Sequence, residues 1–530
     1  MMKKVIKTYA FALLTSGLML SNISCQKTLK DEFLNPDGYT SPTIESFFVD
    51  LQQRLGTFRY AYGEMYHTFS VFNRMLGTGG FVNDGVTNTY SWGHSQYTDI
   101  FDKLRTVAEI ERRYKNLSAD EQKQYTAYYA ASQTIKYYLF YQLTDTYNDI
   151  PYSQALQGKD NVFFPKFEKQ ELVYKDILSQ LKTLSENLKG YTVGTSFIET
   201  QFASNDISFK GDIAQWRSFI NSLRMRIAIH LTNVAPELAQ STIKEVLADG
   251  VYAKDKASSF LMTDRQQDRA TEFLLARAMI EQRSSLWLPE NMLKVLRKIG
   301  FPDDPRLKVL FQPDKDGNYS AMPTEGPFDQ AFTDKITNTN LAATYPSMYN
   351  RTTFEQNFAM PYQIITSSEV HLILAEAALR WPDLGLNATT EYQTSISQSI
   401  DLYYDINALN NSSYASPAPG AKAVKPSATE INAFVQAKIA EFNAANTLEK
   451  KGLIYDQKYV HFNMLKPYEL WTETRRLYKE LGDRVIKKPT SRRMMERVPY
   501  PTTESVNNAD NFSEVAGVSN FTSPVWLSGR

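Results

Sequence analysis

The most regular pattern of hydrophobic and polar positions in the chain runs from Ser118 to Tyr152. Apolar side chains recur there at three- and four-residue steps, which places on one helix face Tyr125, Tyr128, Ala131, Ile135, Tyr138, Leu139 and Leu143. Ser118 and Glu121 have the spacing of a capping box. Because the residue before Pro151 is disfavoured in a helix, the helix is expected to end at 148–151. The pattern predicts one long helix whose tyrosines lie in the core.

The same periodicity predicts helices on both sides of this stretch. They cover 43–76, 170–188, 213–231, 236–248, 289–299, 370–381, 390–404, 427–443 and 454–481. Thr366 with Glu369, and Ser427 with Glu430, repeat the capping-box spacing. Successive helices joined by short turns are typical of stacked helical hairpins, so the fold is predicted to be all-α.

The periodicity is weakest between 251 and 362, where a short strand is expected at 259–262. The turn at 314–318 has some features of a calcium loop, but Gly317 stands at the fourth position instead of the sixth, so we predict a plain hairpin turn. With no Gly/Ser-rich linker in the chain, we expect a single body. Its helical scaffold would cover about 40–250 and 363–485, and the irregular region 251–362.

The first 24 residues have the pattern of a secretory signal peptide. Lysines precede a short apolar run, which is too short to remain as a membrane span. Cys25, the sole cysteine, follows at the place where a lipoprotein signal peptidase would cut. We therefore expect residues 1–24 to be removed and Cys25 to carry acyl chains, which would hold residues 25–530 to a membrane by this anchor alone. The alternative is a secreted protein with an unrelated cysteine.

Composition narrows the possible functions. The formal charge of the whole chain is zero, and residues 1–24 carry three lysines and no acid, so the mature protein stands at about −3. This balance does not favour nucleic acid as a partner.

The sequence offers no arrangement typical of an active site. The five histidines are scattered at His67, His94, His230, His371 and His461, without the H-E-x-x-H spacing. There is no G-x-S-x-G elbow, and the glycine-rich stretch 77–85 lacks the order of a phosphate-binding loop. We therefore predict no catalytic residues, no metal and no cofactor. His371 is predicted to be a hydrogen-bonded core residue, and the pair Arg475-Arg476 an internal salt-bridge anchor.

Several motifs occur in an order that carries a resemblance. They are TDTYNDIPY from Thr144, DDPRL from Asp303, EVHLILAEAALRW from Glu369, QKYVHFNMLKPYELWTETRRL from Gln457 and RVPYPTTESVNN from Arg497. Together with the lipoprotein start they resemble the SusD/RagB family over nearly the whole chain. The charged triplet Lys30-Asp31-Glu32 is similar to a short signal that directs lipoproteins to the cell surface in Bacteroidetes.

The resemblance implies an all-α fold with tetratricopeptide-like helix pairs and an irregular ligand-binding half. It implies a lipid-anchored protein at the outer membrane, on the cell surface, that captures nutrients without chemistry. It also implies a partner, a TonB-dependent β-barrel transporter of the SusC type, which the protein would cover as a lid. The ligand would be an oligosaccharide, whose rings stack on aromatic side chains while its hydroxyls bond to planar polar groups.

The family's ligand residues are poorly shared, so the candidate residues come from loop position. The residues expected to contact ligand are Asn83, Asp84, Tyr90, Trp92, Trp287, Tyr345, Tyr349 and Arg351. Tyr90 and Trp92 are placed in the loop that follows the glycine-rich stretch, with helical periodicity resuming near Tyr97. Packing is an equal alternative for each. Three further functions stay open: peptide uptake by the same complex, a surface glycosidase of helical type, and a protein-binding helical adaptor.

Overall fold

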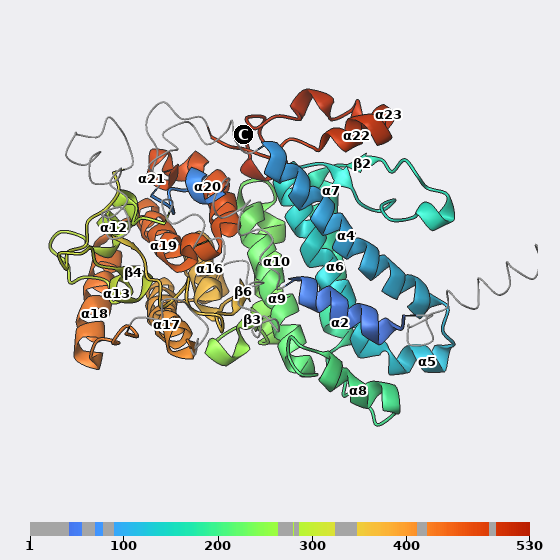
Figure 1. Ribbon diagram of the computed structural model, residues 1–530, viewed down its shortest axis with the longest axis horizontal. Helices are drawn as coiled ribbons and strands as arrows, with labels where there is room; N and C mark the ends of the chain where they lie inside the picture. Colours follow the sequence, from blue (N-terminus) through green and yellow to red (C-terminus); the bar gives the residue numbers. More distant parts are fainter. Residues whose placement is uncertain are drawn as a thin grey trace, which may run out of the picture.

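The computed structural model describes residues 42–55, 69–77, 90–262, 279, 286–323, 347–410, 421–486 and 494–530. Helices dominate these ranges (Figure 1), so the prediction of an all-α fold is confirmed. The longer helices are α2 (Ile44–Leu55), α4 (Tyr90–Lys115), α5 (Ala119–Gln124), α6 (Thr126–Tyr147), α7 (Gln170–Asn187), α8 (Phe197–Asn205), α9 (Ile213–His230), α10 (Pro236–Asp249), α12 (Glu290–Leu296), α16 (Ser367–Arg380), α17 (Ala388–Leu409), α18 (Ala428–Ala444), α19 (Thr447–Phe462) and α20 (Pro467–Leu481).

Short elements complete the described fold. The short helices are α3 (Phe69–Phe72), α13 (Leu307–Leu310), α21 (Asp483–Ile486), α22 (Thr502–Asn507) and α23 (Ala509–Phe512). The strands pair antiparallel, two by two: β1 (Ile150–Pro151) with β2 (Phe167–Glu168), β3 (Phe260–Met262) with β6 (Tyr362–Ile365), and β4 (Phe311–Gln312) with β5 (Met348–Tyr349). Within the ranges above, a search for helices long and apolar enough to cross a membrane finds none.

The long helix predicted from Ser118 is interrupted once. Its capping box is confirmed, because the Glu121 N–H donates to the Ser118 hydroxyl and the Glu121 carboxylate accepts the Ser118 N–H at 2.8 Å. Tyr125, however, leaves the helical conformation at φ −92° and ψ 8°, which separates α5 from α6. The stop is confirmed at Asn148, whose φ of 72° turns the chain out of the helix before Pro151.

Helix α6 lies at the centre of the first half of the fold. It packs against α2, α4, α7, α8 and α9. Its predicted core tyrosines are buried: the Tyr128 ring meets Phe48 edge-on at 5.4 Å, and the Tyr138 ring lies 6.1 Å from Phe219. Aromatic packing around one helix therefore organises this half.

The second half contains one difference from the predicted helices. The prediction of a single helix over 454–481 is wrong, because the chain breaks between α19 and α20. At the break, Asn463 has φ 33° and Pro467 starts α20 at a position where its missing N–H costs nothing.

Helix α8, in the first half, was not predicted at all. Of the helix predicted over 43–76, the described residues contain α2 and the short α3 (Phe69–Phe72), and residues 73–77 are not helical, so its predicted end is wrong. The other predicted helices are present within one to five residues at most ends.

A buried network of charges joins the two halves. Arg226 on α9 donates to Glu369 on α16 at 2.5 and 2.8 Å and to Glu469 on α20 at 3.0 Å, and Lys466 donates to Glu369 at 2.6 Å. In Figure 1, α9 stands between the helices of the first half and the orange helices of the second. Because breaking a buried ion pair leaves a charge without compensation, this network fixes how the halves meet.

The capping box predicted at Thr366 and Glu369 is only half formed. The Thr366 hydroxyl accepts the Glu369 N–H at 3.2 Å, so the N-cap is present. The Glu369 side chain does not return to the cap, since Arg226 and Lys466 take its carboxylate. The third predicted box, at Ser427 and Glu430, is complete.

Three smaller predictions are confirmed. Arg475 and Arg476 are internal anchors: Arg475 pairs with Asp145 at 3.1 Å, and Arg476 pairs with Glu376 at 2.6 Å. His371 is a satisfied histidine, bonded to the Glu391 carboxylate at 2.5 Å and to the Lys254 carbonyl at 2.8 Å. The segment at 314–318 is a turn, in which the Asp314 carboxylate accepts backbone N–H groups and Gly317 has φ 82°.

The C-terminal segment contains α22 and α23 and runs back to the end of α6. The Val498 N–H donates to the Thr146 carbonyl at 3.1 Å, and the Tyr500 hydroxyl donates to the Asp149 carbonyl at 2.6 Å. The Trp526 N–H donates to the Asn148 side chain at 2.8 Å. The last described segment therefore packs against the helix that organises the first half.

Candidate ligand-binding site

Three segments that are far apart in the sequence pair with one another at a site that we call the junction, defined by Gly77, Trp287 and Met348. Trp287 forms β-bridges to both Gly77 and Met348. The Gly77 N–H donates to the Trp287 carbonyl at 2.9 Å, and the Leu288 N–H donates to the Ser347 carbonyl at 2.7 Å. The junction brings Trp287 beside the segment that carries Tyr349 and Arg351, three of the predicted ligand residues.

The close approach at the junction explains why a glycine stands at position 77. A Cβ atom there would lie 2.7 Å from the Met322 Cβ and 2.9 Å from the Trp287 carbonyl oxygen. Both distances are shorter than van der Waals contact, so only glycine lets the backbones meet.

Trp287 and Tyr349 lie inside the junction. Trp287 is 2% exposed, and its indole N–H is buried without a hydrogen-bond partner among the described residues. Tyr349 is fully buried, its hydroxyl donates to the Met75 carbonyl at 2.8 Å, and its ring lies 4.4 Å from that of Phe311. The structure therefore gives both side chains packing roles, and ligand contact by either stays a prediction.

Arg351 lies two residues beyond β5 and keeps part of its side chain, 25%, exposed. Its guanidinium donates to the Glu355 carboxylate from Nε at 2.9 Å and from Nη2 at 2.7 Å. Such a pair holds the guanidinium plane in one orientation, which suits recognition of a planar or hydroxylated ligand.

The structure describes the remaining predicted ligand residues only in part or not at all. Tyr90 and Trp92 belong to the first turn of α4, so the expectation that helix resumes only near Tyr97 is wrong. Their backbone is helical, and a ligand contact by their side chains stays a prediction. Asn83, Asp84, Tyr345 and the predicted lipidation residue Cys25 lie outside the described residues.

The described residues include no group of three or more His, Cys, Asp or Glu side chains that could hold a metal ion. The functional features that sequence reasoning missed are Gly77 and Met348, which pair with Trp287. The glycine-rich composition around Gly77 was the only sign of a close backbone approach.

A comparison with protein families matches residues 65–501 to the SusD-like family described as "Starch-binding associating with outer membrane". The chain belongs to the SusD-like family. No curated protein sequence matches it.

Solved structures agree with the SusD-like fold. A SusD homolog from Bacteroides fragilis superimposes with a TM-score of 0.70 at 18% identity, covering 92% of this chain and 100% of the other. A chitin-binding SusD homolog from Flavobacterium johnsoniae gives 0.61 at 18% identity, covering 92% and 98%. A protein described only as chitin-binding gives 0.69 at 20% identity, covering 92% and 100%. At these identities the comparison shows the fold.

Proposed function

We propose that this SusD-like protein binds a nutrient glycan at the cell surface and serves as the capture subunit and lid of a SusC-like TonB-dependent transporter of the outer membrane. The junction of Gly77, Trp287 and Met348 supports the proposal, because it brings Trp287 beside the segment that carries Tyr349 and the partly exposed Arg351. A ligand site of this kind combines aromatic faces with a few fixed polar groups.

Two further observations support a glycan ligand and a binding role. The family is described as starch-binding, and two proteins of the same fold are described as chitin-binding. SusD-like proteins are in general binding proteins and not enzymes. A protein of this kind would hold a ligand for transport and leave it unchanged.

The experiment that tests the proposal has two parts. The tagged lipoprotein is first isolated from native outer membranes in mild detergent, and a large β-barrel protein should be recovered with it. The purified lipoprotein is then titrated with maltooligosaccharides, chitooligosaccharides and short peptides. Binding of a glycan that weakens in Arg351→Ala would support the site. Binding of peptides alone would favour peptide uptake, and release of sugar products from a polysaccharide would favour a glycosidase.

A further inference from the structure

Two large aromatic side chains lie at the surface of the hairpin that joins β1 to β2. Phe163 and Phe164, adjacent in the chain, are 64% and 65% exposed. Phe167, three residues further on, is buried, and its ring meets that of Tyr500 at 5.3 Å. The hairpin thus turns one aromatic residue into the core and leaves two outside, and a contiguous exposed apolar pair is a sign of an interaction surface. We call Phe163 and Phe164 the aromatic tip.

The structure holds the aromatic tip in place. The pairing of β1 with β2 closes the hairpin at its base. On the carboxyl side of the tip, the Asn511 amide donates to the Phe164 carbonyl at 3.0 Å, and the Asn508 amide donates to the Pro165 carbonyl at 2.8 Å. The two rings are therefore presented by a fixed turn, so a contact with another surface requires little further ordering of the backbone.

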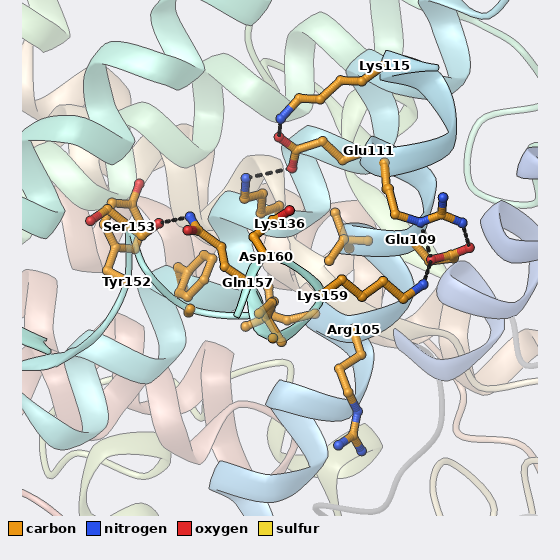
Figure 2. Close-up of a pocket in the computed structure, with 18 of the residues that line it drawn as sticks. Arg105, Glu109, Glu111, Lys115, Lys136, Tyr152, Ser153, Gln157, Lys159 and Asp160 are labelled. Atoms are coloured by element: carbon orange, nitrogen blue, oxygen red, sulfur yellow. Dashed lines mark hydrogen bonds and ion pairs between the residues drawn. The ribbon is translucent and has the colours of Figure 1, made fainter. Parts of the chain in front are cut away.

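A chain of contacts connects the hairpin to the start of the described chain. Lys159, four residues before the tip, pairs with Glu109 on α4 at 2.9 Å (Figure 2). Glu109 also pairs with Arg113 at 2.9 Å, and the Arg113 guanidinium lies 5.3 Å from the centre of the Phe47 ring on α2. Helix α2 begins at Ile44, two residues after the first described position. The aromatic tip and the start of the described chain therefore lie at the same end of the fold.

The predicted lipid anchor is attached through this same end. Cys25 stands 17 positions before residue 42, so the connecting chain spans at most about 60 Å when fully extended. A tether of this length would keep the aromatic tip near the membrane surface and raise its effective concentration there. A contact between the tip and lipid would then form even if its intrinsic affinity were low.

The size of the aromatic tip favours a lipid surface over a protein partner. At the observed exposure, two phenylalanine side chains present on the order of 200–300 Å². A stable protein interface buries about 800 Å² on each partner, which is well beyond what the tip offers. Aromatic side chains, by contrast, enter the boundary between lipid headgroups and acyl chains without needing a matching surface.

Charge contributes little to such a contact. Residues 158–169 carry three lysines and two acidic residues, a net charge of +1. Lys159 and Lys169 are already paired, with Glu109 and Asp149 at 2.9 and 2.7 Å. The contact should therefore depend on burial of the two rings and hardly on salt.

We infer that the aromatic tip is a second, reversible point of contact with the lipid bilayer, at which the rings of Phe163 and Phe164 enter the interfacial region. The inference goes beyond the proposed function and rests on the predicted acylation of Cys25. Two rings bury less apolar surface than one acyl chain, which itself binds membranes only marginally, so the tip orients the protein and does not anchor it.

This contact would fix one end of the fold next to the membrane. Figure 1 shows the hairpin that leads to β2 on the right, whereas α12 and β4, near the junction, lie at the opposite end of the longest axis. The candidate ligand site would therefore lie at the end of the fold that the tip leaves free.

The test measures how close the tip lies to lipid. A fluorophore is attached to Lys166→Cys, an exposed position two residues after the tip, in the full-length lipoprotein reconstituted into vesicles that contain nitroxide-labelled phospholipid. Quenching by the lipid nitroxide should be strong there. It should be weak at Ile299→Cys, a 97% exposed position three residues after α12. Raising the salt concentration should leave both values unchanged.

Removing the two rings should abolish the contact. Phe163→Ser/Phe164→Ser should lower its equilibrium constant by about tenfold or more, so that quenching at position 166 falls to the value at position 299. Ile299→Ser, a matched apolar-to-polar change on the surface, should leave quenching at position 166 unchanged. Thermal melting identifies any variant that fails to fold, and Phe164→Ser alone serves if the double variant does not fold.

The labelling itself checks the tether. The lipoprotein without an added cysteine should take up no fluorophore, because Cys25 is the sole cysteine and lipid would block its thiol. Uptake of the fluorophore would remove the tether and overturn the inference.

Other outcomes would also overturn it. These are equal quenching at positions 166 and 299, and quenching at 166 that survives the loss of both rings. A loss of copurified β-barrel protein in the double variant, without lipid quenching in the parent, would assign the tip to the transporter. A change in the oligomeric state of the purified lipoprotein would assign it to a second copy. Glycan titration of the double variant tests the proposed function separately and should give unchanged binding.

Discussion

Arg226 and Glu369, 143 residues apart in the sequence, form a two-point ion pair in the interior of the protein. Both side chains are almost completely buried, and Lys466 shares the same carboxylate. The pair joins α9 to α16 and so connects the two helical halves. Because buried charges are costly without partners, the interaction specifies one arrangement of the halves more than it adds net stability.

Removing one partner of this buried ion pair should strongly destabilise the protein. Arg226→Met leaves Glu369 and Glu469 less compensated, and we expect the free energy of unfolding to fall by about 3–5 kcal/mol. Denaturant titration followed by circular dichroism measures it. Lys123→Met, which breaks an exposed pair with Asp120, is the matched control and should cost less than about 1 kcal/mol. A similar small loss for both variants would show that the buried network does not hold the halves.

Acid should destabilise the protein in two stages. Burial lowers the pKa of His461 from 6.5 to about 3, so the unfolded chain takes up a proton first and stability falls as pH drops from 6.5 to 3. Against the effect of burial, the charges of Arg226 and Lys466 lower the pKa of Glu369 from 4.5 to about 2, so its contribution is present above pH 4.5 and is lost toward pH 2.

Denaturant titrations from pH 7 to 2 measure both stages. His461 alone contributes a slope of up to about 1.4 kcal/mol per pH unit below pH 6.5. In His461→Asn, which retains groups able to bond Thr366 and Ser399, the slope between pH 6.5 and 4.5 should decrease. An unchanged slope would mean that His461 titrates normally in the folded protein.

Gly77→Ala should disturb the junction. Its methyl group would enter a space bounded by Met322 at 2.7 Å, and we expect a loss of about 1–3 kcal/mol together with weaker glycan binding. Gly517→Ala is the control, because nothing lies within 4 Å of the added carbon, and its effect should stay within about 0.5 kcal/mol. Thermal melting and ligand titration measure the two effects, and a fully stable, fully binding Gly77→Ala would refute the close approach.

Asn148 combines a positive φ with a side-chain contact to the C-terminal segment. Asn148→Ala loses the Trp526 N–H partner and strains the backbone, for an expected cost of about 2–4 kcal/mol. Asn148→Gly keeps the backbone free and loses only the side-chain contacts to Trp526 and Asp149, which Asn148→Ala loses as well, so its cost should be smaller, about 1–3 kcal/mol. Denaturant titration compares them, and equal costs would show that the positive φ carries no strain.

Cys25→Ala should release the protein from membranes, because the acyl chains are expected to be its only anchor. Fractionation of cells that express the variant, followed by immunoblotting, measures the membrane-bound share. The same substitution should leave glycan binding by the purified protein unchanged. Membrane-bound protein in spite of Cys25→Ala would refute the lipid anchor.

The sequence predicted the helices and caps, which depend on neighbouring residues, and missed the contacts that depend on residues far apart in the chain. Helical periodicity and the boxes at Ser118 and Ser427 located most helices, because three- and four-residue spacing is local. Glu369 fits the same cap pattern, yet its carboxylate bonds to Arg226 and Lys466, which no local pattern can show.

The candidate site was predictable only as a set of loops. Loop position selected Trp287 and Tyr349, but their burial follows from pairing with Gly77 and Met75, residues more than two hundred positions away.

The return of residues 494–530 to the end of α6 has a consequence for secretion. A chain that emerges N-terminus first exposes Thr146, Asn148 and Asp149 long before Val498, Trp526 and Tyr500 arrive to bond with them. In a chain exported as the predicted signal peptide requires, the Thr146 and Asp149 carbonyls and the Asn148 side chain would lack these partners until the last residues arrive. The contacts that complete the end of α6 would then form only after residues 494–530 have crossed the membrane.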